Sequence, residues 1–196
     1  AERPLAALLP AEAGEQLQLL TTKLPDFAQG WRVQGAFQQQ DNQSGAAEVS
    51  LKHYVDLAKA QNNNAQSAGG LTQAYLLLSQ IAEQRGDYAA AQGWLDRIDN
   101  AQDLFSVRNQ RASILARQGK LEQGLELIRA APENSQEDAR IKLMAQVQLL
   151  RNNKKYQAAY DLLAAASAKD PTDTDLIYDQ AMLADKLNHP ADMERL

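Results

Sequence analysis

A small residue recurs in this chain at an almost constant spacing, and apolar residues usually follow it four and seven positions later. The recurring positions, in chain order, are Ala13, Ala47, Ala91, Gly124, Ala159 and Met193. All but one of the gaps are about 34 residues, and the exceptional gap carries an insertion of about ten residues. Met193 departs from the pattern because its side chain is large. A repeat of this length is typical of a stack of similar helical units.

The clearest copy of the unit is the segment 72–100, TQAYLLLSQIAEQRGDYAAAQGWLDRIDN. Its apolar residues recur every three or four positions on both sides of Gly86-Asp87, as in two short amphipathic helices. Gly86 can adopt the left-handed conformation that ends a helix, and Asp87 can accept hydrogen bonds from the first N–H groups of the next helix. Ser79 and Ala91 are small where the two backbones must approach. We therefore expect an antiparallel helical hairpin.

The chain resembles the tetratricopeptide repeat (TPR) family. The residues that carry this resemblance are Trp31 and Gly35; Tyr75, Leu78 and Ser79; Ala159, Leu163, Ala166 and Pro171; and Ala13, Leu17, Leu20 and Pro25. Arg108 and Arg111 depart from the family pattern, because an aromatic residue and a leucine are expected there. The resemblance covers nearly the whole chain and implies an all-α, right-handed superhelical solenoid of stacked antiparallel helix hairpins.

The repeat register predicts one continuous TPR-like array. Its predicted segments are a partial repeat at 1–27, a repeat at 28–61, an inserted loop at 62–71, repeats at 72–104, 105–139 and 140–173, and a truncated repeat at 174–196. The sequence QNNNAQSAGG predicts an irregular loop, which is either a tolerated surface insertion or a mobile lip beside a groove. Neither end shows a polar terminal element, so we expect a fragment of a longer array or ends that pack against another chain.

Local signals give further expectations about helix boundaries. Pro10 disfavours a helix before Ala11. Ser135 and Thr172 stand three residues before acidic residues and are predicted to cap the helices that follow them. The turn at Lys154-Lys155 has no glycine, and we expect it to be less tight than the turn at Gly86.

The composition excludes several function classes. The 196 residues include 20 Lys and Arg and 25 Asp and Glu, for a net charge of −5, and no basic stripe suits a nucleic-acid backbone. No stretch approaches the roughly 18 apolar residues of a transmembrane segment. Cysteine is absent, which excludes disulfides and zinc–thiolate sites. We therefore expect protein or peptide partners, no nucleic acid and no transmembrane segment.

No catalytic constellation is evident. The histidines, His53 and His189, lie in different repeats and have no base or ligand partner at useful spacing. Nucleophile, zinc, phosphate-loop and calcium-loop motifs are missing as well. The clustered aspartates Asp170, Asp173, Asp175 and Asp179 straddle a proline turn and two helix caps, which favours a structural role over a metal site. The sequence thus predicts a chain that is not an enzyme and has no cofactor or metal.

In TPR proteins the first helices of successive units line a concave groove, and the resemblance implies such a groove here. The predicted partner-binding residues are Arg32, Leu76, Gln80, Asn109, Arg117, Met144, Gln148, Arg151, Tyr178 and Met182. Guanidinium and amide groups can bind carboxylates or peptide backbone, whereas methionine and tyrosine offer an adaptable apolar strip. Some family members hold a C-terminal carboxylate with paired lysine and asparagine. Leu76 and Gln80, like Met144 and Gln148, replace that pairing, which disfavours such recognition.

These observations lead to two hypotheses. The first is a non-enzymatic protein–protein interaction scaffold or adaptor that binds a peptide or protein in the concave groove. The alternative is a structural or self-association module, part of a longer TPR array, whose ends or convex face make the contacts. The tracts LSQIAEQRGDYAAAQGWL and IYDQAMLADKL also resemble multi-repeat lipoproteins of Gram-negative bacterial envelopes. That resemblance implies a periplasmic or outer-membrane-attached protein, with a cytoplasmic location as the alternative.

Overall fold

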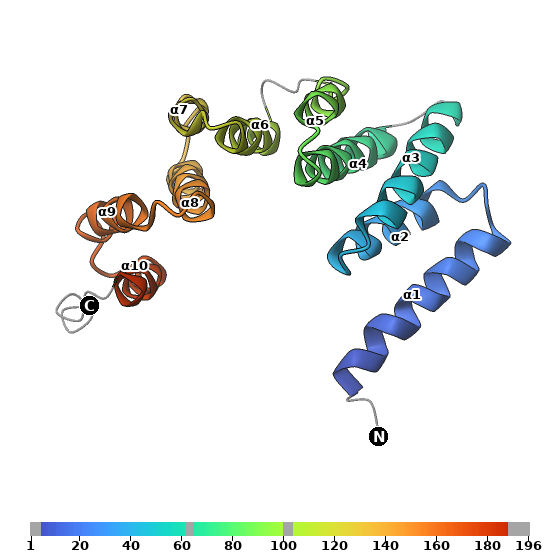
Figure 1. The fold of residues 1–196 in the computed structure, drawn as a ribbon, viewed down its shortest axis with the longest axis horizontal. Coiled ribbons are helices and arrows are strands. Elements are labelled where there is room, and N and C mark those ends of the chain that lie inside the picture. The colour runs from blue at the N-terminus through green and yellow to red at the C-terminus, as the bar shows by residue number, and fades with distance from the viewer. Residues whose placement is uncertain (1–4, 62–64, 100–103, 188–196) are drawn as a thin grey trace. The chain divides into compact units, whose positions relative to one another are not determined.

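The computed structural model describes residues 5–61, 65–99 and 104–187, and every regular element in these ranges is a helix (Figure 1). The helices are α1 (Leu5–Lys23), α2 (Ala28–Gln40), α3 (Ser44–Ala60), α4 (Ala65–Gln84), α5 (Tyr88–Leu95), α6 (Phe105–Arg117), α7 (Leu121–Arg129), α8 (Gln136–Asn152), α9 (Tyr156–Ser167) and α10 (Thr174–Lys186). The chain forms two compact units, Ala1–Asp103 and Leu104–Leu196, which are described separately below. Short turns join helices that pack on one another, as in α2 with α3 and α8 with α9. The predicted all-α fold of stacked antiparallel hairpins is confirmed.

In unit 1 the small positions of the second helices lie at the hairpin interfaces. Ala47 on α3 and Ala91 on α5 are fully buried, and so are Leu51 and Leu95 one turn later. Ser79 on α4 is buried as well, as expected for a residue that allows two backbones to approach. Burial of each large aliphatic side chain contributes roughly 1.5–3 kcal/mol, so these layers supply much of the stability of the unit.

Unit 2 repeats this arrangement around one apolar core. The core comprises Ala112, Ala116, Leu125, Ile128, Val147, Leu149, Leu150, Ala159, Leu163, Leu176 and Leu183. Arg108 and Arg111, which break the family pattern in α6, are only half-buried, and Val107 and Ile114 occupy the interior of that helix instead. The departure in sequence therefore leaves an apolar packing face on α6.

Four hairpin turns share one backbone geometry. A residue with positive φ follows the first helix in each: Asn42 (59°), Gly86 (78°), Gly119 (80°) and Lys154 (59°). At Lys154 the backbone N–H groups of Lys154 and Lys155 donate to the carbonyls of Arg151 and Leu150 at 3.0 and 2.9 Å. The turn at Gly86 has the same pair of bonds, both at 2.9 Å, which is a Schellman motif. The expectation of a looser turn at Lys154 was wrong, because lysine adopts the left-handed conformation there.

Several local expectations about helix boundaries need correction. Helix α1 begins at Leu5 and continues through Pro10, and α4 begins at Ala65, so residues 65–71 of the expected loop are helical. Residues 62–64 of that loop lie outside the described residues. Ala13 on α1 is exposed, and it is Gly14 that lies against α2, with its missing Cβ 3.0 Å from the ring of Phe37. Met193 and His189 also lie outside the described residues.

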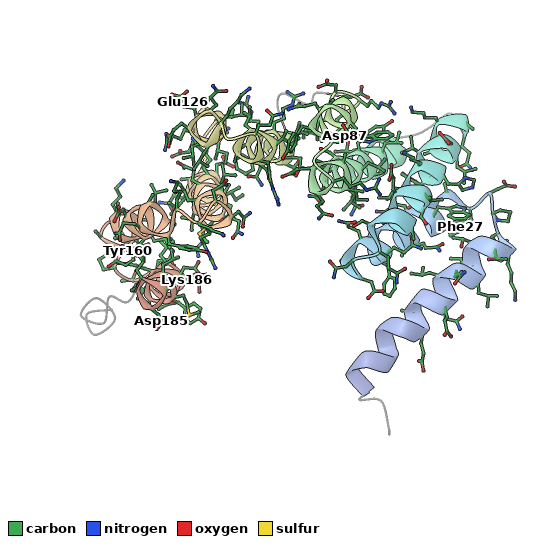
Figure 2. The ribbon with its side chains drawn as sticks, in the orientation of Figure 1. Phe27, Asp87, Glu126, Tyr160, Asp185 and Lys186 are labelled. Atoms are coloured by element: carbon green, nitrogen blue, oxygen red, sulfur yellow. The ribbon has the colours of Figure 1, made fainter. Side chains whose placement is uncertain are left out.

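The helix caps match the sequence in two places and differ in one. Asp87 accepts a hydrogen bond from the Ala90 N–H at 3.0 Å, and Ser135 accepts one from Asp138 at 3.1 Å (Figure 2 labels Asp87). Helix α10, however, is capped by Asp173 rather than Thr172. The Thr172 hydroxyl donates instead to Asp170 at 2.7 Å.

Candidate protein-interaction faces

The first helices of the hairpins carry all the residues that were predicted to bind a partner. The helices α2, α4, α6 and α8 each carry one predicted residue at the same sequence distance before the left-handed turn residue. These residues are Arg32, Leu76, Asn109 and Met144. Gln80 and Gln148 lie one turn later in their helices. Arg32, Leu76 and Gln80 belong to unit 1 and the other predicted residues to unit 2. A groove that continues through both units therefore stays a prediction.

In unit 1 this face is lined by amide and guanidinium groups. The Arg32 Nε donates to Oε1 of Gln29 at 2.8 Å, and its Nη1 donates to Oε1 of Gln73 on α4. Leu76 is half-buried and Gln80 is exposed. The guanidinium thus links neighbouring first helices and holds their amides at the surface. Glu83, three residues after Gln80 on α4, is buried with 7% of its surface exposed.

In unit 2 the first helices α6, α8 and α10 follow one side of the unit, and α7 and α9 follow the other (Figure 1). Asn109, Arg117, Gln148 and Arg151 are exposed on this first-helix side. Gln148 donates to Oδ1 of Asn152 at 2.8 Å, which holds its amide along the helix. Met144 is half-buried and packs against the core of the unit.

Helix α10 presents the largest apolar side chains of this face to solvent. Tyr178 and Met182 lie one turn apart, and 65% and 53% of their surfaces are exposed. Ile141 on α8 is exposed as well, one turn before Met144. The sequence analysis missed Ile141, although its three-residue spacing from Met144 could have indicated a shared face. Together the exposed side chains supply apolar contact area beside polar groups.

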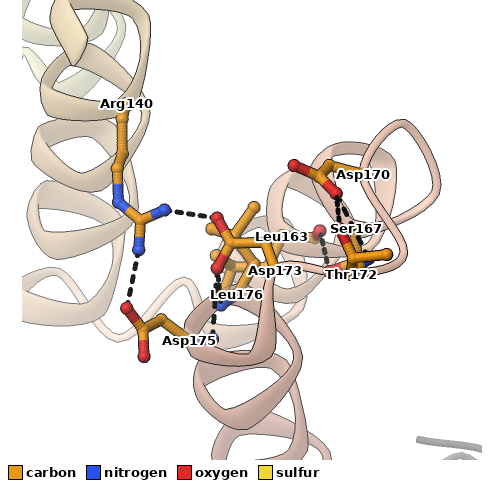
Figure 3. Close-up of polar contacts among 8 residues, drawn as sticks. All are labelled: Arg140, Leu163, Ser167, Asp170, Thr172, Asp173, Asp175 and Leu176. Carbon is orange, nitrogen blue, oxygen red and sulfur yellow. Dashed lines mark hydrogen bonds and ion pairs between the residues drawn. The ribbon is translucent and has the colours of Figure 1, made fainter. Parts of the chain in front are cut away.

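An ion-pair clamp joins the N-terminal ends of α8 and α10 (Figure 3). The Arg140 guanidinium pairs with Asp173 through Nη1 and with Asp175 through Nη2, the latter at 3.0 Å. Asp173 also accepts hydrogen bonds from the backbone N–H groups of Leu176 and Asp175, both at 3.1 Å. The Leu176 N–H and, after it, the Arg140 side chain hold the pKa of Asp173 below its ordinary value. The same pairing raises the pKa of Arg140.

A cavity of about 540 Å³ lies beside this clamp, between α8, α9 and the start of α10. Leu143, Leu162, Ala166 and Leu176 form its apolar lining, and charged residues including Arg140 and Lys169 line it as well. The clustered aspartates near Asp170 thus serve turns, a helix cap and an ion pair. In the part of the chain that the structure describes, no group of three or more His, Asp or Glu side chains could hold a metal ion.

His53 takes part in a packing contact between two aromatic rings. The ring of His53 packs edge-on against Trp31, with ring centroids 4.4 Å apart and planes inclined by 70°. Its contact is therefore an aromatic packing contact.

Among the helices of the described ranges, none combines the length and the apolar character needed to cross a membrane.

Comparisons with known proteins place these helices in context. No family model matches the chain. It is similar to a TPR repeat-containing protein of Pseudomonas aeruginosa, with 25% identity over 123 residues that cover 62% of this chain and 21% of that protein. The chain thus spans about a fifth of the length of this curated relative. The likeness to the TPR family is confirmed, and the lipoprotein subtype stays a prediction.

Among solved structures, the chain is similar to one in the crystal structure of the APC/C hetero-tetramer Cut9–Hcn1. The sequence identity is 16%, and the match covers 96% of this chain and 43% of that one. The TM-score is 0.39.

Proposed function

We propose that this chain is a non-enzymatic protein-interaction scaffold, and that the first-helix face of unit 2 binds a peptide or protein partner. The observation that carries the proposal is the exposure of Tyr178 and Met182 on α10. Apolar surface gains roughly 25 cal/mol per Å² when it is removed from water, so a partner that covers both side chains gains free energy from them. Methionine adapts to varied shapes, and tyrosine combines apolar area with a hydroxyl group.

Polar groups on the same helices support this proposal. Arg151 lies in the last turn of α8, is exposed, and forms no ion pair within the described part of the chain. Its planar guanidinium can bind a carboxylate of the partner with two parallel hydrogen bonds. Gln148 lies one turn earlier and offers an amide. A partner with an apolar anchor and a carboxylate or exposed peptide groups suits this combination.

The clamp at Arg140 contributes by fixing α10 to α8. The exposed side chains of Tyr178 and Met182 lie on α10, whereas those of Gln148 and Arg151 lie on α8. Because Arg140 binds Asp173 and Asp175 at the start of α10, both helices present their side chains from a connected frame. A frame that is already ordered loses less conformational entropy when a partner binds.

A quantitative pull-down tests the proposal with a matched control. We would compare the native chain with a Tyr178→Ala/Met182→Ala double variant and with Val49→Ala, which removes an exposed apolar side chain from α3 in unit 1. We expect a partner that is retained by the native chain and by Val49→Ala and lost by the double variant. If all three proteins retain the partner equally and their melting temperatures are unchanged, the partner does not bind this face.

A second candidate function is self-association, and a separate apolar surface favours it. Leu19 on α1 and Leu24 and Phe27 in the turn before α2 are each about half exposed. Sedimentation at tens of micromolar distinguishes the candidates. Association that disappears in a Leu24→Ser/Phe27→Ser variant supports the second function, and a monomer at all concentrations excludes it.

The finer assignment to the bacterial envelope rests on sequence resemblance alone. We propose further that the scaffold acts as an adaptor for enzymes of the bacterial envelope. Fractionation of cells that produce the full-length protein tests this assignment. Recovery with the periplasm or outer membrane supports it, and recovery with the cytoplasm contradicts it.

A further inference from the structure

A pocket lined by several charged side chains lies in unit 1, mainly on α3 and α5. The pocket, of about 310 Å³, opens between α3, the end of α4 and α5. Its charged residues include the cations Lys52, Arg85 and Arg97 and the carboxylates Glu48 and Asp87. The ring of Trp94 lines it too. Most of the side chains come from α3 and α5, the second helices of two hairpins, and Arg85 follows the end of α4. The pocket lining includes neither Leu76 nor Gln80 of the first-helix face.

Both carboxylates of this pocket already accept hydrogen bonds from groups of the same chain. Glu48 binds Lys52 Nζ at 2.7 Å through one oxygen and pairs with Arg85 Nη1 through the other. The bond from Lys52 is the largest cause that holds the pKa of Glu48 below its ordinary value. Asp87 accepts the Ala90 N–H at the start of α5. Neither acid is therefore a strong site for an added cation.

The cations, in contrast, retain unused donors. The guanidinium carbon of Arg97 lies 4.2 Å from the centroid of the Trp94 ring, and Arg97 forms no ion pair within the described ranges. The Trp94 ring also stacks with Tyr75, with centroids 6.0 Å apart and planes inclined by 22°. Stacking on an anchored aromatic ring orders the guanidinium while its N–H edge stays able to donate. Lys52 Nζ lies 5.9 Å from the same ring and has donors beyond the one that Glu48 uses.

Gly93 keeps the pocket open. It lies in α5 beside Trp94, and a Cβ built on it would meet nothing within 4 Å. The glycine is therefore not required by backbone geometry or by a close contact. A large side chain at this position can occupy the pocket without strain on the helix.

We propose that this pocket binds a carboxylate from an acidic segment of a partner protein. The Arg97 guanidinium, stacked on Trp94, donates to the carboxylate, and Lys52 adds a second positive charge. Charge complementarity selects this ligand, because the pocket has three cations against two carboxylates. Glu48 is already paired with Lys52 and Arg85, and Asp87 accepts the Ala90 N–H. The proposal does not depend on the first-helix face, and a partner can use one site without the other.

The test follows the two tryptophan indole N–H resonances by NMR during titration with an acetylated, amidated hexaglutamate peptide. Trp94 reports on the pocket, and Trp31, whose Nε1 donates to the Pro25 carbonyl, is an internal control. We expect a saturable shift of the Trp94 resonance, no shift at Trp31, and a weaker response at high salt. A hexaglutamine peptide should produce no shift.

Variants decide whether the pocket is responsible. Arg97→Gln should weaken the apparent affinity about fivefold, since Arg97 is exposed and water screens its charge. Gly93→Leu should abolish the response by filling the pocket, and Arg151→Gln in unit 2 should leave it unchanged. No shift at millimolar hexaglutamate overturns the proposal. An unchanged response in both pocket variants, or an equal response to hexaglutamine or inorganic phosphate, overturns it as well.

Discussion

Gly124 on α7 lies so close to Ala112 on α6 that a Cβ at position 124 would stand 2.7 Å from the Ala112 carbonyl oxygen. The obstructing atom belongs to the backbone of the buried residue Ala112, so it cannot rotate away. The contact sets how closely the two helices of this hairpin approach. It also explains why the recurring small residue of the repeat is glycine in this unit and alanine in its neighbours.

Gly124→Ala should therefore lower the free energy of unfolding by about 1–3 kcal/mol, as overpacking usually does. Gly93→Ala is the matched control, because it also replaces a helical glycine but meets open space. The control should be neutral or stabilising by up to about 1 kcal/mol, since alanine favours helix. Urea unfolding of both variants measures the difference, and equal stabilities would contradict this account of the contact.

A second glycine pair tests the interface between α3 and α4. A Cβ on Gly70 would overlap the hydroxyl of Tyr54, which is buried, whereas a Cβ on Gly69 would meet nothing within 4 Å. Gly70→Ala should cost about 1–3 kcal/mol of unfolding free energy because the rigid ring cannot move aside easily. Gly69→Ala should cost nothing. If the two variants melt at the same temperature, Gly70 does not lie against Tyr54 as described.

The left-handed turn at Lys154 predicts a stabilising substitution. At a φ of 59° the Cβ of lysine is sterically unfavourable, and glycine has no Cβ. Lys154→Gly should raise the free energy of unfolding by about 0.5–1 kcal/mol. Lys155→Gly is the control, because Lys155 has a φ of −89° and glycine gains nothing there. Chemical denaturation of the two variants compares them, and equal or inverted effects would argue against the Schellman geometry at this turn.

The clamp between Arg140 and Asp173 predicts a dependence of stability on pH. The folded-state pKa of Asp173 is lowered, so its contribution is fully present above the pKa of an unfolded aspartate, about 3.9, and is lost as pH falls through the folded value. Asp173→Asn should reduce the melting temperature at pH 7, and the difference from the native chain should shrink below about pH 4. A difference that stays constant from pH 7 to pH 3 would contradict the ionised clamp.

Features that depend on neighbours along the chain could be predicted from the sequence. The recurring small residue and the apolar residues after it predicted which faces of α3, α5, α7 and α9 are buried. Asp87 and Ser135 were identified as caps because each accepts from an N–H three residues later. Such interactions form within one or two helical turns, so spacing alone reveals them.

Features that join distant residues, or that override a local preference, depend on how the helices pack and could not be predicted from the sequence. Lysine has no local preference for the left-handed conformation, yet packing of α8 on α9 holds Lys154 there. Gly69-Gly70 is locally a turn signal, but Gly70 serves a close contact with Tyr54. The pocket around Trp94 brings Lys52 and Arg97 together from different helical hairpins. Contacts at that separation depend on how whole helices pack, and the order of residues in one repeat does not contain that information.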